Sequence, residues 1–250
     1  MTLNKQLAMA LDPALLMEAA GFTPDPWQYE LLRSTSRRLL VNVSRQSGKS
    51  TSTAALALHG ALFDPGSLTL LVSASLRQSG ELFRKVVAFY AALGKPIDAV
   101  EDNAQSLALA NGSRIVSLPG NPDKVRGFSA PRLIVVDESA QVTDEMHMAL
   151  SPMMAISQGR TIELSTPYGR RGHFFEAFTA DGGDYERIAL KATENPRMNP
   201  EFLDEERRIL GPRWFSQEYL GEFHDTVGQV FSSESIEAAM DNAIQPLFPE

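Results

Sequence analysis

The sequence predicts an α/β fold with a mostly parallel central sheet flanked by helices. Short apolar runs alternate with amphipathic helical patterns through the middle of the chain, as they do in βαβ units. These runs contain few polar positions, as strands covered on both faces require. A loop containing Gly48 and Lys49 lies between one such run and the following helix, where phosphate-binding loops occur.

The first half of the chain predicts alternating helices and strands. The N-terminal amphipathic pattern ends at Asp12-Pro13 and is typical of a structural helix, because it has no continuous apolar segment before a cleavage site. Gly94 and Pro96 end a long amphipathic helix. The expected elements are strands over 38–43 and 68–72 and helices over 48–62 and 76–93.

The second half predicts a hairpin, two further strands and two short helices. Asn111-Gly112 is a strong turn signal between two β-like runs and predicts a hairpin over 106–118. The prolines and Gly211 after Lys191 separate two short charged helices. The remaining expected elements are strands over 133–136 and 161–165 and helices over 201–210 and 213–220.

These patterns divide the chain into three parts. Residues 1–190 are expected to form the α/β core with its N-terminal helices, and residues 191–225 a small helical lid subdomain. Residues 226–250 are too few for another domain and are expected to be a linker.

Composition excludes several classes of protein. The chain has 250 residues, of which 43% are hydrophobic and 22% charged, as in ordinary globular proteins. No apolar run approaches the roughly 20 residues of a membrane span. The absence of cysteine excludes disulfides and thiolate metal sites. The net charge of −8 means that any contact with DNA must be local.

The loop from Ser44 to Ser50, SRQSGKS, carries the strongest chemical signal. Phosphates are bound by backbone N–H groups at a helix N-terminus, by a lysine and, through Mg²⁺, by a hydroxyl group. Gly48, Lys49 and Ser50 supply these groups in order. The first glycine of the common pattern is replaced by Val43, and a surface turn that opens a helix is the simpler alternative.

An acidic pair follows a buried strand about ninety residues later. Asp137 is expected to hold Mg²⁺ through water, and Glu138 to polarise the attacking water, as in the Walker B arrangement. Alternatively, the pair only solvates a strand end or caps the next helix. The order of strand, P-loop, strand and acidic pair within one α/β domain favours a phosphohydrolase.

Three other features are candidate parts of the site. Ser165-Thr166 ends a strand and is expected to sense the γ-phosphate, although an ST turn before Pro167 is an alternative. Gln28 can read an adenine edge with Trp27 packed beside it, unless both are structural. Arg45 and Arg126 are candidate cations for the transition state. The residues expected to bind nucleotide are Trp27, Gln28, Ser44, Gln46, Ser47, Gly48, Lys49, Ser50 and Thr51.

Taken together, these residues resemble the ATPase domain of the large terminase subunit, the DNA-packaging motor of tailed bacteriophages. The resemblance extends from about residue 20 to 225. It rests on Trp27-Gln28 and on the sequences SRQSGKS, VVDESA, STPYGRRGHF, NPRMNPEFLDEERR and WFSQEYLGEF.

The resemblance implies an ASCE-type P-loop NTPase that uses ATP and Mg²⁺. Gln28 would match the adenine-reading Q motif, and Ser165-Thr166 the coupling motif. Glu138 would be the catalytic glutamate. Arg126 would match the position proposed as a finger offered to the neighbouring subunit, and Arg45 would act as a sensor within its own subunit.

The resemblance also implies partners and a location. These are double-stranded viral DNA, a portal protein, a small terminase subunit, a ring of five copies of the chain and the cytoplasm of the infected bacterial host, with no membrane involved. Full-length family members continue into a nuclease domain. We therefore expect residues 226–250 to lead toward such a domain, and no nuclease activity from residues 1–250.

DNA is expected to meet a local basic surface. Arg77 and Gln78 follow the second strand at a position that faces DNA in related translocases, and Arg170-Arg171 is the other compact basic pair. The alternative for each pair is that it only lies in solvent at the start of a helix and does not contact DNA. His59, His147, His173 and His224 show no zinc spacing, so we expect packing or surface roles and no structural metal.

Two alternative functions remain open from the sequence. The first is a helicase-like or nucleic-acid-remodelling P-loop ATPase, which would need a second domain of the same type. The second is a nucleotide-gated assembly module with little turnover. The variant Glu138→Gln separates the two. A motor should lose ATP turnover but still bind ATP, whereas a pure binding switch should keep its function.

Overall fold

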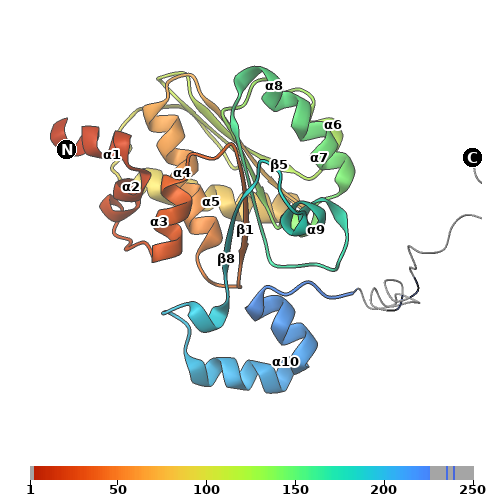
Figure 1. Cartoon of the computed structure of the whole chain (residues 1–250). Coiled ribbons are helices and arrows are strands. Elements are labelled where there is room, and N and C mark those ends of the chain that lie inside the picture. The colour runs from red at the N-terminus through yellow and green to blue at the C-terminus, as the bar shows by residue number, and fades with distance from the viewer. Residues whose placement is uncertain (1–2, 226–234, 236–238, 240–250) are drawn as a thin grey trace, which may run out of the picture.

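A computed structural model describes residues 3–225 together with Ser235 and Ala239, and its described part is built around one sheet (Figure 1). The eight strands described there lie in the order β3-β4-β5-β2-β6-β7-β1-β8. Their bounds are β1 Arg38–Val43, β2 Leu68–Ser73, β3 Ala99–Asp102, β4 Ser106–Leu109, β5 Arg114–Pro119, β6 Leu133–Asp137, β7 Arg160–Ser165 and β8 Glu186–Leu190.

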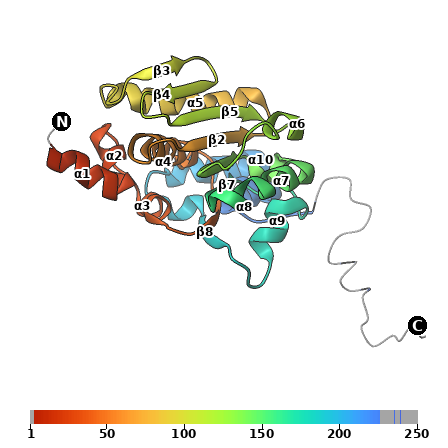
Figure 2. The same cartoon turned by 90° about the horizontal axis from the view of Figure 1, so that it is seen from above.

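Two layers of helices cover this sheet (Figures 1 and 2). The first group is α1 Leu3–Leu11, α2 Pro13–Ala19, α3 Pro26–Arg33, α4 Lys49–Phe63 and α5 Leu76–Ala92. The second group is α6 Pro122–Val125, α7 Asp144–Leu150, α8 Met154–Ser157 and α9 Gly172–Thr179. The helix α10 Pro200–Leu220 lies apart from both layers, below the sheet in Figure 1.

The strands that carry the site are parallel and adjacent. The strand β7 lies between β1 and β6, pairing Asn42 with Ser165 on one side and Leu164 with Asp137 on the other. The carboxyl ends of these three strands therefore meet at one edge of the sheet, where ligands bind in open α/β folds. Only the β3–β4 and β4–β5 pairings are antiparallel in the described sheet, which confirms the mostly parallel sheet.

The period-two alternation of strand side chains produces two cores. Val135 belongs to the larger cluster under α2 to α5, whereas its neighbours Ile134 and Val136 belong to the cluster under α6 to α8. All six residues of β2 and all five of β6 are buried. Continuous apolar runs thus become strands covered on both faces.

A third, smaller apolar cluster belongs to the segment after β8. It contains Ala192, Leu203, Phe215 and Tyr219. Within α10 the backbone of Gly211 is not helical, with φ 75° and ψ 166°, so Pro212 begins a second helical segment. The expected pair of short helices is confirmed, and a separate apolar cluster is what a small helical subdomain requires.

The sequence missed two edge strands and correctly predicted the hairpin. β4 and β5 pair antiparallel across Asn111-Gly112 as expected. β3 and β8 were not predicted, and β8 adds a parallel edge strand beside β1.

The predicted linker over 226–250 lies outside the described residues, apart from Ser235 and Ala239. None of the helices described is both long and apolar enough to cross a bilayer.

Replacing Asp12 by Ala is expected to lower the free energy of unfolding by about 1 kcal/mol at neutral pH. The carboxylate of Asp12 caps α2 by accepting a hydrogen bond from Ala14 N at 3.0 Å, and it pairs with Arg33. The hydrogen bond from Arg33 holds the pKa of Asp12 below its usual value. Its charge-dependent stabilisation is therefore complete above the unfolded-state pKa and is lost as pH falls through the folded-state pKa.

Urea denaturation of both proteins at neutral and at strongly acid pH measures this effect. The difference in unfolding free energy should shrink in acid, and Asp12→Asn should lose less than Asp12→Ala because an amide oxygen still caps the helix. An equal difference at the two pH values would contradict the role of the charge.

Candidate nucleotide-binding site

The loop between β1 and α4 has the backbone of a phosphate-binding turn. Gly48 has φ +88°, and Gln46 also lies in the left-handed region with φ 59°. The loop leads directly into α4, a helix of 15 residues, so its N–H groups and the positive end of the helix dipole face the same place. A pocket of about 450 Å³ opens there.

Lys49 is the buried cation of this pocket. Its ammonium group donates hydrogen bonds to the carbonyl oxygens of Val43 and, at 3.3 Å, of Ser44. Burial lowers the pKa of Lys49, and the nearby carboxylates of Glu138 and Asp137 oppose that shift. A buried lysine at the N-terminus of a helix is suited to bind phosphate charge.

Ser50 and Asp137 meet although 87 residues separate them. The hydroxyl of Ser50 donates to Asp137 Oδ2 at 3.1 Å. Burial raises the pKa of Asp137, while Lys49 and the hydrogen bond from Ser50 act in the opposite direction. A hydroxyl and a carboxylate in contact are the oxygen ligands that Mg²⁺ prefers, so these two residues fit the ion.

Glu138 lines the same pocket and has a strained backbone. Its φ of 53° places it in the left-handed region, which a non-glycine residue adopts only where its surroundings enforce it. Its backbone N–H donates to Asp137 Oδ1 at 3.1 Å. Burial raises the pKa of Glu138, with Lys49 opposing. Glu138 therefore lines the same pocket as the loop from Ser44 to Ser50.

Ser165 and Thr166 are buried at the end of β7, beside this pair. The hydroxyl of Ser165 accepts a hydrogen bond from Ala140 N at 3.2 Å. Ala140 is two residues beyond Glu138, so the two segments that follow β6 and β7 are joined.

The segment after β8 also contacts the loop. Arg45 pairs with Glu218 of α10 through Nε and Oε2 at 2.5 Å. The amide of Asn195 donates to the hydroxyl of Ser47 at 3.0 Å, and Ser47 bonds Ser44. Glu218 and Asn195 were missed as site residues, although both lie in stretches on which the family resemblance rests.

Helix α5 contributes a cation that sequence reasoning missed. Lys85 lines the pocket and donates to the hydroxyl of Thr51 at 3.3 Å. Nothing in the local sequence distinguishes Lys85 from other surface lysines. Gln78 also lines this pocket, although it was predicted to face DNA, and it forms a capping box with Ser75.

Gln28 and Trp27 are both buried and do not line the pocket. Gln28 Oε1 accepts a hydrogen bond from Asp25 N at 2.8 Å, which caps α3. Its amide nitrogen lies against Gly48, where an added Cβ would approach it to 2.7 Å. Trp27 packs in the larger core. The structure thus places Gln28 behind the phosphate loop, and an adenine-reading role stays a prediction.

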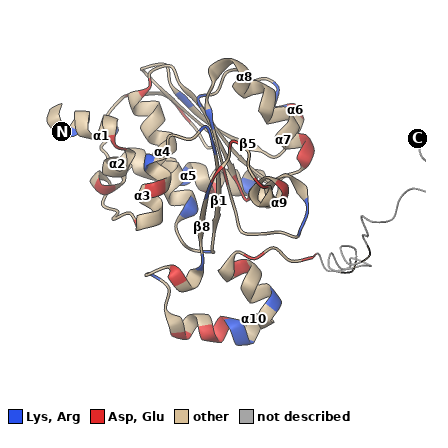
Figure 3. Ribbon diagram, viewed as in Figure 1, with Lys and Arg blue, Asp and Glu red and all other residues tan. Residues whose placement is uncertain are grey.

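The remaining arginines predicted for the site lie outside the pocket. Arg126 follows α6, has 71% of its side chain exposed, and pairs with Asp123 at 3.4 Å. Arg77, Arg170 and Arg171 are exposed as well. Figure 3 shows Lys and Arg dispersed over many elements, with both signs of charge on α10, so these residues form no single basic face in that view.

Ten residues line the pocket, and they come from the phosphate loop, α4, α5 and the segment after β6. They are Arg45, Gln46, Ser47, Gly48, Lys49, Ser50, Gln78, Lys85, Glu138 and Gln141. Two larger pockets, of about 580 and 650 Å³, lie elsewhere on the molecule. Size alone does not identify a phosphate site, whereas a lining that includes a glycine turn, a lysine and a hydroxyl group suits phosphate.

Gly48→Ala is expected to lower the free energy of unfolding by about 1 to 2 kcal/mol and to weaken nucleotide binding. The positive φ of Gly48 is strained for alanine, and the new methyl group would press on Gln28. Gly60→Ala, inside the helix that Gly48 caps, is a matched control, because its Cβ would meet nothing within 4 Å and its φ is ordinary. Urea denaturation and titration with a fluorescent ATP analogue measure both effects, and equal behaviour of the two variants would contradict the assignment.

Comparisons with known proteins agree on one family. Residues 40–238 match the family model described as "Terminase large subunit, T4likevirus-type, N-terminal". The large terminase subunit of Thermus virus P23-45 is 25% identical over an alignment 252 residues long. This alignment covers 86% of this chain and 52% of that protein. The chain therefore spans about half the length of the curated relatives it matches.

Solved structures show the same fold. The large terminase ATPase domain of Thermus phage P74-26 superposes with a TM-score of 0.73 at 21% identity, covering 83% of this chain and 96% of that one. The large terminase of another thermophilic bacteriophage, solved in complex with ADP, gives a TM-score of 0.61 at 9% identity and covers 83% and 52%. At these identities the comparison concerns the fold, and it confirms the predicted α/β fold with a mostly parallel central sheet flanked by helices.

Proposed function

The chain belongs to the family of large terminase subunits, and from this premise we propose that it is a Mg²⁺-dependent ATPase that moves double-stranded DNA into a viral capsid. The observation that carries the proposal is the meeting of two distant segments at one pocket. Lys49 and Ser50 from the phosphate loop lie beside Asp137 and Glu138 from the end of β6. The similarity of the fold to a terminase solved with ADP supports the choice of nucleotide.

Each of these residues has a distinct role in the proposed reaction. Lys49 and the N–H groups of residues 44–51 hold the phosphates of ATP, and Ser50 and Asp137 hold Mg²⁺. When bound, the ion supplies positive charge against the charge that develops on the transferred phosphoryl group. Glu138 orients the attacking water and accepts its proton. Arg45 senses the phosphates from within the subunit.

The proposed coupling runs from the phosphate to α10. Ser165 is bonded to Ala140, near the catalytic Glu138, while Arg45 and Ser47 are bonded to Glu218 and Asn195. Departure of the γ-phosphate changes the contacts of the loop, and these bonds pass the change to the segment after β8. Residues 191–225 act as the lid in this proposal.

The partners proposed for the chain are those of a packaging motor. They are double-stranded DNA, a portal protein, a small terminase subunit and further copies of this chain in a ring of five subunits. All of them would act within the infected bacterial cell. Arg126, exposed and outside the pocket of its own subunit, is the cation offered to the neighbour. The exposed Arg77, Arg170 and Arg171 are candidates for contact with DNA.

Hydrolysis of Mg²⁺-ATP with and without double-stranded DNA tests the proposal. We expect DNA to raise turnover several-fold, and added salt to remove this stimulation, because phosphate contacts release counterions. Lys49→Ala should abolish both rates. Turnover that is indifferent to DNA would remove the motor proposal, and strand separation by this chain alone would favour a helicase.

A further inference from the structure

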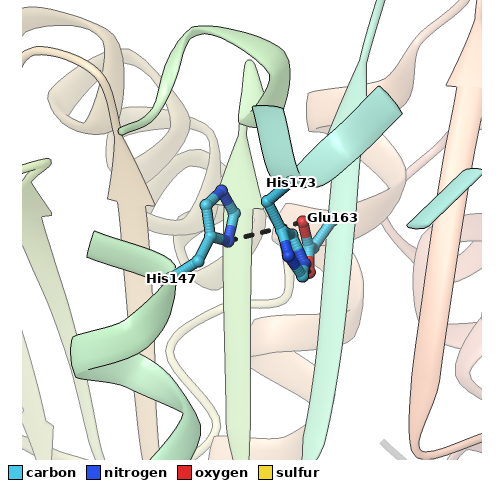
Figure 4. A group of neighbouring side chains, drawn as sticks. All are labelled: His147, Glu163 and His173. Carbon is cyan, nitrogen blue, oxygen red and sulfur yellow. Dashed lines mark hydrogen bonds and ion pairs between the residues drawn. The ribbon is translucent and has the colours of Figure 1, made fainter. Parts of the chain in front are cut away.

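Two histidines and a glutamate converge on the sheet face opposite α4 and α5. Figure 4 shows His147 of α7 and His173 of α9 turned toward Glu163 of β7. The ligand atoms of all three lie within 4.8 Å of one another. The residues come from three separate elements, so their spacing in the sequence showed no metal pattern.

The distances within this His-Glu-His cluster suit a metal ion. His173 Nε2 lies 3.1 Å from Glu163 Oε1, and His147 Nδ1 lies 3.6 Å from Glu163 Oε2. Ligand atoms about 2.0 to 2.1 Å from a tetrahedral zinc ion stand roughly 3.3 Å apart. Each histidine nitrogen thus stands close to that separation from one oxygen of Glu163, and no two of the three ligand atoms are more than 4.8 Å apart.

The carboxylate is already fixed in place for such a role. Glu163 is almost completely buried, and its Oε2 accepts a hydrogen bond from the hydroxyl of Ser139 at 2.7 Å. Burial opposes its charge, but the hydrogen bond from His173 and the charges of both histidines hold the pKa of Glu163 below its usual value. A charged, oriented carboxylate with an outer hydrogen bond is typical of metal ligands.

One side of the cluster opens to solvent. A pocket of about 580 Å³ is lined by all three residues and by Tyr185, whose hydroxyl lies 3.5 Å from His173 Nε2. His173 has 32% of its side chain exposed, whereas His147 is buried and its Nε2 has no hydrogen-bond partner. An ion can therefore reach the cluster from solvent, and water or the hydroxyl of Tyr185 can occupy the fourth coordination position of that ion.

We propose that His147, Glu163 and His173 bind a divalent transition-metal ion of the Zn²⁺ type. Two imidazoles and one carboxylate are ligands that Zn²⁺ and Co²⁺ accept, whereas Mg²⁺ prefers oxygen ligands alone. The two imidazole rings stack with centroids 4.2 Å apart, so both histidines lie on the same side of Glu163.

The ion would tie together three elements behind the nucleotide pocket. Glu163 is two residues before Ser165, and its partner Ser139 directly follows Glu138. The ion would therefore clamp β7, α7 and α9 around the segments that carry both residues. The proposal concerns metal binding alone and holds whether or not the chain hydrolyses ATP.

Titration of the chelator-treated chain with Co²⁺ at neutral pH, in excess Mg²⁺, tests the site. We expect one equivalent of Co²⁺ to bind with the visible absorption of a tetrahedral or five-coordinate site, and Zn²⁺ to displace it. His173→Ala and Glu163→Gln should each lose that absorption. Asp137→Asn should keep it, which separates this site from the Mg²⁺ ligands of the nucleotide pocket.

His224→Gln is the matched control, because His224 lies 3.7 Å from Glu222 and forms an ordinary histidine–glutamate pair. It should bind Co²⁺ as the unchanged chain does. If a variant folds poorly, the midpoint temperature of thermal unfolding of the unchanged chain tests the site in its place. This temperature should rise when Zn²⁺ is added. No spectral change and no rise in midpoint, or an unchanged spectrum in His173→Ala and Glu163→Gln, would overturn the proposal.

Discussion

Replacing Glu138 by Gln is expected to lower ATP turnover by about a thousandfold and to leave ATP affinity nearly unchanged. Glutamine has the size of glutamate and can still contact the attacking water, but it cannot accept the proton. Lys49, Ser50 and Asp137, which we propose to hold phosphate and metal, are unchanged in this variant. The loss should therefore fall on the chemical step alone.

Single-turnover phosphate release and equilibrium binding of ATP, measured on the same preparation, separate these two effects. Glu145→Gln is a suitable control, because Glu145 is an exposed glutamate at the start of α7 and lies outside the pocket. Retained turnover in Glu138→Gln would contradict its role as the base. A parallel loss of affinity would place it among the binding groups.

Arg126→Ala is expected to lower turnover by about a thousandfold at concentrations where subunits assemble. The guanidinium of Arg126 lies outside the pocket of its own subunit, and in this chain it pairs with Asp123 at 3.4 Å. An exposed i,i+3 pair of this kind contributes little to stability. Arg126 is therefore available to another subunit, while Arg45 is held beside its own loop by Glu218.

A mixture of two inactive variants distinguishes the two arginines. Lys49→Ala subunits retain Arg126, so they should restore turnover at the intact pockets of Arg126→Ala subunits. The same Lys49→Ala subunits should not rescue Arg45→Ala if Arg45 acts within its own subunit. Arg114→Ala, at an exposed position of β5, should behave as the unchanged chain does. Failure of the first mixture would contradict the shared site.

The central strands could be predicted because their whole surface is buried. Strands β2 and β6 must be apolar at nearly every position, and such runs are visible in a sequence. The edge strands β3 and β8 are different. All four residues of β3 are exposed, and β8 has one fully buried residue, Ile188. Pairing with a neighbour makes them strands, and local sequence does not encode that pairing.

The same distinction applies to the site. The meeting of Lys49 and Ser50 with Asp137 and Glu138 could be predicted, because the first two belong to the loop motif that opens α4 and the last two to the motif that ends β6. Glu218 reaches Arg45 across 173 residues, and its role depends on how α10 returns to the loop. The His-Glu-His cluster likewise depends on the register of β7 against the helices above it. Such long-range contacts need the folded chain.

The turnover of ATP per subunit, measured over a wide range of protein concentration, tests the central claim most directly. That claim is a pocket whose phosphate and metal ligands come from one subunit and whose remaining cation, Arg126, comes from the next. We predict that turnover per subunit rises steeply with concentration and then levels off as subunits assemble. A turnover per subunit that stays constant over the whole range would show that each subunit is complete by itself and would contradict the account.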